Sequence, residues 1–114
     1  MHPLAESQLW LVPLHVRSGS EPIPAPMTGA YVTVFCGAPD ATVAAWTAIQ
    51  AIEAMGYSVP ENPTEVQMMP ASAYEQFVAD QWPDLVSELP DQSELYERLS
   101  DSRLVIGPFA AYEG

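Results

Sequence analysis

The stretch from Ala30 to Val59, AYVTVFCGAPDATVAAWTAIQAIEAMGYSV, constrains the fold of this chain more than any other part. The run Tyr31 to Cys36 is β-branched and aromatic, and its apolar side chains alternate onto both faces, which predicts a strand inside a sheet. Pro39 and Asp40 favour the start of a helix, and Gly56 favours its end about five turns later. We therefore expect strand, turn, helix and strand in this order.

The predicted helix has two faces of different character. At roughly 100° per residue, one apolar stripe should pack against the sheet. It consists of Ala41, Ala45, Ala48, Ile49, Ile52 and Met55. The opposite side is poor in charge and carries Val43, Trp46, Thr47, Gln50 and Ala54. Either other parts of the chain cover this side, or Trp46 and Val43 contact another chain, since tryptophan in a desolvated pocket is a common anchor of interfaces.

The remaining segments predict further short elements. Residues 9–17 alternate as a strand, and Pro13, which lacks an amide donor, favours a sheet edge or a bulge there. The Pro-rich segment 18–29 is either a plain connector or a loop that faces a partner. After it and the central stretch, we expect an irregular strand over 57–69, helical segments at 72–82, 84–89 and 92–99, and a last strand over 103–112 that is bent at Gly107 and Pro108.

These elements fit one domain of 114 residues, the usual size for a single modest core. Their order is β-β-α-β-α-α-β. We expect the α+β class, with a mostly antiparallel four-stranded sheet and helices packed on one face. A ferredoxin-like arrangement is the nearest named alternative.

The charge of the chain is strongly negative and unevenly placed. Fifteen acidic residues stand against three basic ones, for a formal net charge of −12, and lysine is absent. Residues 61–114 hold eleven acids against two arginines, a net charge of −9. This balance makes binding to nucleic acid improbable, and it attracts basic surfaces faster than neutral ones. Ordinary acidic solubility remains an equally open explanation.

The residue types that carry chemistry are scarce. Two histidines and one cysteine form no zinc spacing, and no serine lies in a nucleophile motif. A glycine loop for phosphate is absent, and Cys36 lies in an apolar strand where a thiol acts as a small hydrophobe. We expect no enzyme, no cofactor and no metal. No apolar run reaches the length of a membrane span and no basic region precedes the apolar run at 9–14, so we expect a cytoplasmic protein.

Residues 30–70 carry a resemblance to a known group of proteins. The run YVTVFCGAPD, an alanine-rich helix ending in EAMGYSV, and an acidic helical second half resemble the small α/β immunity proteins of bacterial polymorphic toxin systems. The resemblance implies a cytoplasmic antidote that binds one toxin and blocks its active site, often with surface acids facing a basic cleft.

Two functions of different classes are therefore expected. The first is a non-enzymatic binding protein, an immunity protein or inhibitor that neutralises a basic toxin. Its predicted contact residues are Trp46, Trp82, Asp84, Glu88, Asp91, Glu94 and Glu97. The alternative is a small-molecule-sensing domain, or a homo-oligomer such as a dimer in which the low-charge helix face packs on its own copy.

Overall fold

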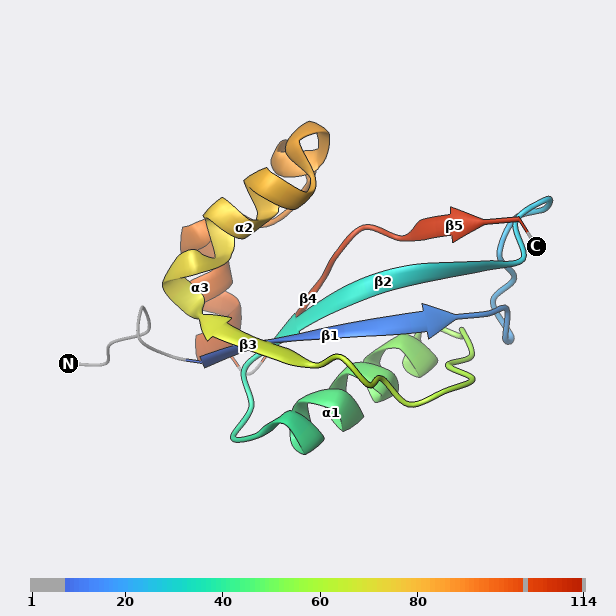
Figure 1. Cartoon of the computed structure of the whole chain (residues 1–114), viewed down its shortest axis with the longest axis horizontal. Helices are drawn as coiled ribbons and strands as arrows, with labels where there is room; N and C mark the ends of the chain where they lie inside the picture. Colours follow the sequence, from blue (N-terminus) through green and yellow to red (C-terminus); the bar gives the residue numbers. More distant parts are fainter. Residues whose placement is uncertain (1–7, 102, 114) are drawn as a thin grey trace.

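The computed structural model describes residues 8–101 and 103–113 (Figure 1). Its strands are β1 (Gln8–Val16), β2 (Gly29–Cys36), β3 (Gln67–Pro70), β4 (Val105–Ile106) and β5 (Ala110–Tyr112). Its helices are α1 (Ala41–Ala54), α2 (Tyr74–Gln81) and α3 (Gln92–Ser100), joined by the short 3-10 helices η2 (Ala71–Ala73) and η3 (Pro83–Glu88).

The strands form one antiparallel sheet in the order β3-β1-β2-β4, and β5 pairs with the other end of β2. The α+β class, the antiparallel sheet and the order of elements are thus as predicted. The expected last strand is divided in two, because Gly107 and Pro108 bend the chain between β4 and β5. The sheet therefore has five strands within the described residues instead of four.

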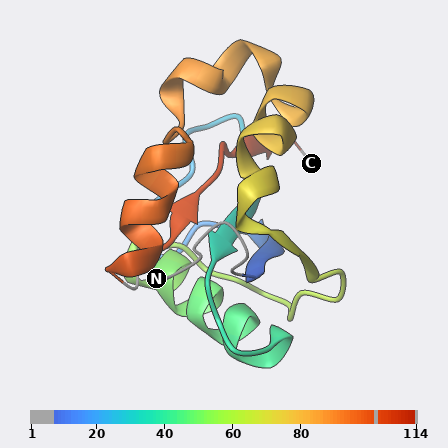
Figure 2. The same ribbon diagram turned by 90° about the vertical axis from the view of Figure 1, so that its left-hand side faces the viewer.

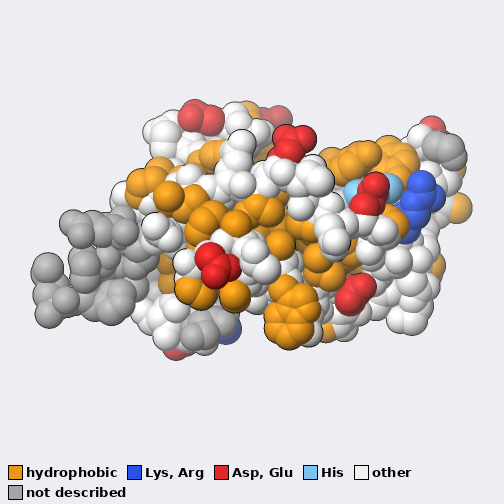
Figure 3. Space-filling model, turned by 60° about the horizontal axis from the view of Figure 1, so that its bottom comes forward, with side chains coloured by type: hydrophobic (Ala, Val, Ile, Leu, Met, Phe, Trp, Pro, Cys, Tyr) orange, Lys and Arg blue, Asp and Glu red, His pale blue; other side chains and the backbone are white. Residues whose placement is uncertain are grey.

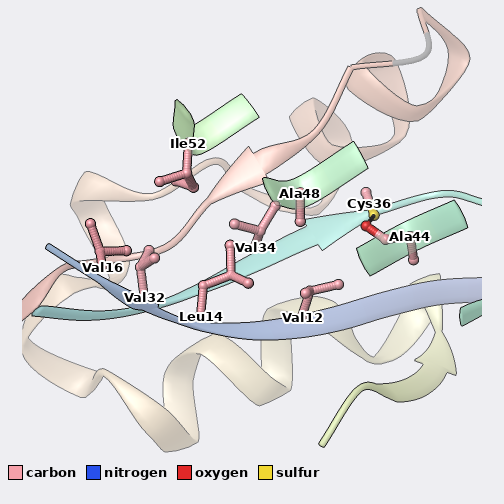
Figure 4. Packing of buried hydrophobic residues seen from close by; sticks show 9 residues of the cluster. All are labelled: Val12, Leu14, Val16, Val32, Val34, Cys36, Ala44, Ala48 and Ile52. Atoms are coloured by element: carbon pink, nitrogen blue, oxygen red, sulfur yellow. Dashed lines mark hydrogen bonds between the residues drawn. The ribbon is translucent and has the colours of Figure 1, made fainter. Parts of the chain in front are cut away.

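One core lies between the sheet and α1. Alternate side chains of β1 and β2 point toward the helix, as expected for a period of two. Figure 4 shows this cluster, which consists of Val12, Leu14, Val16, Val32, Val34, Cys36, Ala44, Ala48 and Ile52. The alanines let the helix approach the sheet closely, so α1 is held by shape as well as by apolar area.

The helices do not all lie on one face of the sheet, and this part of the prediction is wrong. α1 covers one face, whereas α2 and α3 pack against the other around Leu9, Leu11 and Phe35 (Figure 2). The physical reason is that β1 and β2 are apolar on both sides at this end, so both sides must be covered. In Figure 1, α2 and α3 stand over one end of the sheet only.

β1 is not an edge strand, although Pro13 favoured either a sheet edge or a bulge. It lies between β3 and β2, but β3 pairs only with Gln8 to Leu11. The Thr33 carbonyl, opposite Pro13, accepts from Gly107 N at 2.8 Å and so faces away from β1. The missing N–H of Pro13 therefore points to the outer side of β1, where β3 has already ended, and no ladder bond is lost.

α1 begins and ends as its sequence predicts. The Asp40 carboxylate accepts from Val43 N at 2.9 Å, which satisfies a free donor of the first turn. Gly56 follows the helix with a φ of +98°, a conformation that L side chains rarely adopt. The buried stripe is rotated slightly from the predicted one, because Ala44 is fully buried whereas Met55 is 43% exposed.

The Pro-rich segment 18–29 connects β1 to β2 and is tied to the end of α1. Glu21 N donates to the Gly56 carbonyl at 2.9 Å, and Ile23 N donates to Ser18 Oγ at 2.9 Å. These bonds give the connector a defined path, while most of its side chains stay exposed.

Candidate functional site

Trp46 is the most exposed large apolar side chain in the described chain, at 63%. It lies on α1 at the rim of an open hollow of about 490 Å³. The hollow is lined by Ala41, Thr42, Ala45, Trp46, Ile49, Asn62, Pro63, Thr64 and Val66. No described loop covers Trp46, which leaves its indole available for contact.

The hollow exists because the segment 57–66 leaves the sheet and returns to it. Ser58 exchanges two backbone hydrogen bonds with Arg17, at 2.8 and 2.9 Å, at the end of β1. Regular pairing with β1 resumes only at Gln67. Pro60 and Pro63 lie between these points and offer no amide donors, so the segment loops outward beside α1.

Figure 3 shows the molecule from the side of α1 and of segment 57–66. Hydrophobic side chains form a broad band across this face, with scattered acidic side chains among them. Exposed apolar groups of this kind on one face are typical of an interaction surface. Trp46 and Val43, which is 40% exposed, are the apolar side chains that α1 contributes to the outside of the helix.

A second group of side chains gathers on the uncovered part of the sheet. His15 Nδ1 lies 2.5 Å from Glu61 Oε1, and His15 Nε2 is hydrogen bonded to the Tyr112 hydroxyl. The Tyr31 ring stacks on His15, with centroids 5.1 Å apart and planes at 25°. A carboxylate only accepts, so Nδ1 of a neutral imidazole donates to Glu61, and Nε2 accepts from Tyr112.

His15, Tyr31 and Glu61 of this group line a second open hollow of about 340 Å³. Its lining is Pro13, Leu14, His15, Tyr31, Glu61, Asn62, Pro63, Thr64 and Glu65. Asn62, Pro63 and Thr64 also line the hollow beside Trp46. We call residues 61–65 the ridge, because the two hollows lie on its two sides. The sequence did not predict this second hollow.

The predicted acidic contact residues lie on η3 and α3, whereas Trp46 lies on α1. Asp84 and Glu88 are exposed on η3. On α3, the Asp91 carboxylate caps the helix by accepting from Glu94 N at 2.8 Å, Glu94 pairs with Arg98 at 3.1 Å, and Glu97 is exposed. Because α3 packs on the face of the sheet opposite α1, a flat partner surface cannot contact these acids and Trp46 at once.

Trp82, the second predicted anchor, lies in the core between the sheet and α2. Its ring makes edge contacts with Phe35 and Phe77, at centroid distances of 6.1 and 6.0 Å. It is half-buried there, so its main contacts are internal. The structure therefore separates the two tryptophans into one surface residue and one packing residue.

The thiol of Cys36 is buried against α1, with its Sγ 3.7 Å from the Ala44 carbonyl oxygen (Figure 4). Burial raises the pKa of this thiol to about 11, because the thiolate would be poorly solvated. The thiol therefore stays protonated at neutral pH and is a poor nucleophile. Among residues 8–101 and 103–113, histidine, cysteine and acidic side chains form no group of three that would hold a metal.

Comparison of the chain with protein-family models, curated proteins and solved structures finds no match. In the part of the chain that the structure describes, no helix has the length and apolar character to cross a bilayer. The two hollows, the ridge and the charge of the molecule are the features that bear on its function.

Proposed function

We propose that this protein is a non-enzymatic binding protein that captures a basic partner protein, as an immunity protein or inhibitor captures a toxin. The observation that carries the proposal is Trp46, 63% exposed at the rim of an open hollow of about 490 Å³. A rigid aromatic side chain beside a hollow is the usual form of an interface anchor. Trp46 on α1 and the ridge 61–65 would form the centre of the contact.

The charge of the chain supports a basic partner. A net charge of −12 attracts a positive surface over several ångströms and repels an acidic one. The carboxylates of Asp84, Glu88 and Glu97 have no hydrogen-bond or ion-pair partner among the described residues, so they contribute fully to this field. Because α3 and α1 lie on opposite faces of the sheet, the acids of α3 would steer the partner rather than contact the surface that covers Trp46.

Capture from the native source, at low salt, tests the proposal. Three baits are compared: the unchanged chain, Trp46→Ala, and Gln50→Ala as a matched control on the exposed side of α1 outside the hollow. We expect one basic protein to be retained by the unchanged chain and by Gln50→Ala, and at least tenfold less of it by Trp46→Ala. Retention of no basic protein, or equal retention by all three baits, would contradict the proposal.

A second test uses the captured partner in purified form. Glu88→Lys with Glu97→Lys should slow association several-fold, and added salt should remove the difference between this variant and the unchanged chain. Dissociation should stay the same, because these side chains are placed for steering. A change in dissociation alone would place the acids in the contact itself.

The outer face of α1 also favours a homodimer as the alternative. Val43 and Trp46 are both exposed there, at 40% and 63%, and two copies of this face could cover each other. Light scattering at high protein concentration distinguishes the two cases. A strict monomer excludes the dimer, whereas a dimer that Trp46→Ala dissociates would replace the proposed function.

A further inference from the structure

The hollow on the sheet side of the ridge contains an unusual set of groups for an exposed surface. Tyr31 is 57% exposed in the middle of the sheet. Its ring centroid lies 5.1 Å from that of His15, on which it stacks, and 5.5 Å from that of Tyr112. Two carboxylates, Glu61 and Glu65, lie at the ridge side of the same hollow. An aromatic face and two acids therefore border one space of about 340 Å³.

The positions of these groups are fixed by hydrogen bonds and by one glycine. Glu61, His15 and Tyr112 form a chain that ties the ridge, β1 and β5 together. A Cβ atom on Gly29 would lie 2.3 Å from the Tyr112 hydroxyl oxygen, so only glycine leaves room for that ring to cross β2. The hollow is thus pre-organised, which lowers the entropy lost when a ligand binds.

The charge around the hollow selects the kind of ligand. Only Oε1 of Glu61 contacts His15, so its second oxygen can accept another hydrogen bond, and Glu65 makes no ion pair within the described residues. A cation over Tyr31 gains from the ring quadrupole and from both carboxylates. The basic residue closest to this group along the chain is Arg17, which follows His15 by two residues and pairs with Ser58 just past the end of β1.

We propose that this hollow receives an arginine side chain of the partner, with the guanidinium over Tyr31 and its N–H groups donating to Glu61 and Glu65. Arginine fits better than lysine, because its planar group can stack on a ring and donate to two acceptors at once. This inference rests on the proposed function, since it names what the basic partner contributes. A partner segment that crosses the ridge would contact Trp46 on one side and place the arginine on the other, because the ridge lines both hollows.

The test uses N-acetyl-arginine amide as the probe, with the matching citrulline and lysine amides. Citrulline has nearly the same shape as arginine but no charge. We expect the arginine amide to shift the NMR signals of Tyr31, His15 and Glu65 at millimolar concentration, and the citrulline amide to bind about tenfold more weakly. Equal binding of arginine and citrulline amides would overturn the inference.

Variants of the protein test whether the arginine amide binds in this hollow. Tyr31→Phe keeps the ring and should keep the affinity, whereas Tyr31→Ala should lower it about fivefold. Glu65→Gln should weaken binding several-fold, and Arg17→Gln should strengthen it by a similar factor. Glu53→Gln is the control for net charge, because Glu53 is exposed on α1 and lines neither hollow. If Glu53→Gln weakens binding as much as Glu65→Gln, general attraction explains the result and the inference fails.

The two proposals fail separately. If the arginine probe does not bind but Trp46→Ala still abolishes capture of the partner, the arginine site is wrong and the proposed function stands. If the probe binds with the expected dependence on Tyr31 and Glu65, the site is supported even where capture finds no partner, and the proposed function alone is contradicted.

Discussion

Replacing Trp82 by alanine should mainly weaken folding, whereas replacing Trp46 by alanine should mainly weaken binding of the partner. Trp82 packs edge-on against Phe35 and Phe77 in the core, and each aromatic pair contributes about 0.5–1.5 kcal/mol beyond its buried area. Buried tryptophan-to-alanine changes cost about 3–5 kcal/mol, and Trp82 is only half-buried. We therefore expect Trp82→Ala to lower the free energy of unfolding by about 3 kcal/mol.

The corresponding loss for Trp46→Ala is smaller. Trp46 is 63% exposed, so a little over a third of its surface, roughly 90 Å² of a side chain that covers about 250 Å², is in contact with the protein. At about 25 cal/mol per Å² this gives an upper value of about 2 kcal/mol. Residual burial in the unfolded chain and the higher helix propensity of alanine reduce it to about 1 kcal/mol.

Urea unfolding followed by far-UV circular dichroism measures both losses without relying on tryptophan fluorescence. With a slope of about 1.5 kcal/mol/M, the midpoint should fall by about 2 M for Trp82→Ala and by about 0.7 M for Trp46→Ala. Trp46→Ala should nevertheless be the variant that weakens capture of the partner. If its midpoint falls as far as that of Trp82→Ala, Trp46 belongs to the core and the proposed docking surface loses its anchor.

Four further changes test the fold. Ile52→Ala, in the fully buried stripe of α1, should cost about 3 kcal/mol in urea unfolding, and Asp91→Ala, which removes the cap of α3, about 1 kcal/mol. Gly29→Ala should displace Tyr112 and speed amide exchange in β5, because the new Cβ would meet the tyrosine hydroxyl. Burial raises the pKa of the Cys36 thiol from 9.0 to about 11, so as the pH rises the unfolded state loses this proton before the folded state does. The contribution of the buried thiol to the free energy of unfolding is therefore complete below pH 9 and is lost as the pH rises to about 11. Cys36→Ala should flatten this decline in the free energy of unfolding.

The elements that the sequence predicted well are those whose signals are local. β1, β2 and α1 follow from side-chain periodicity together with Asp40 and Gly56, which act within one turn of the helix ends. The division of the last strand into β4 and β5 likewise follows from the adjacent Gly107 and Pro108. In each case the residue that decides the structure lies within a few positions of the element it limits.

The distribution of helices over two faces depended on information that periodicity does not contain. Leu9, Leu11 and Phe35 showed apolar groups on the second face of the strands, but not which later segment covers them. Tyr74 and Leu95, from α2 and α3, are fully buried in that cluster. Their helical stripes would fit either face equally well, so the choice is made by tertiary packing.

The candidate site shows the same difference between features that local sequence predicts and features that need long-range packing. The outward position of Trp46 follows from helical geometry alone, because it lies well away from the line through Ala44, Ala48 and Ile52. The second hollow required the register of β1 against β2, which places His15 opposite Tyr31. It also required Tyr112 to return to β2 from 97 residues after His15, which no local pattern predicts.

On the proposed function, the acidic surface of η3 and α3 and the face of Trp46 have separate roles in binding. The acids affect the rate of association, and the face of Trp46 affects the lifetime of the complex. Exposed charges act through solvent over about one Debye length, roughly 8 Å at physiological ionic strength, so Asp84, Glu88 and Glu97 raise the frequency of encounter without fixing its geometry. Contacts that exclude water fix the geometry, and in this molecule they would come from the ridge, with Trp46 on one side and Tyr31 on the other. Association of the proposed complex would then depend on salt, while its lifetime would depend on the two aromatic side chains that the fold leaves uncovered.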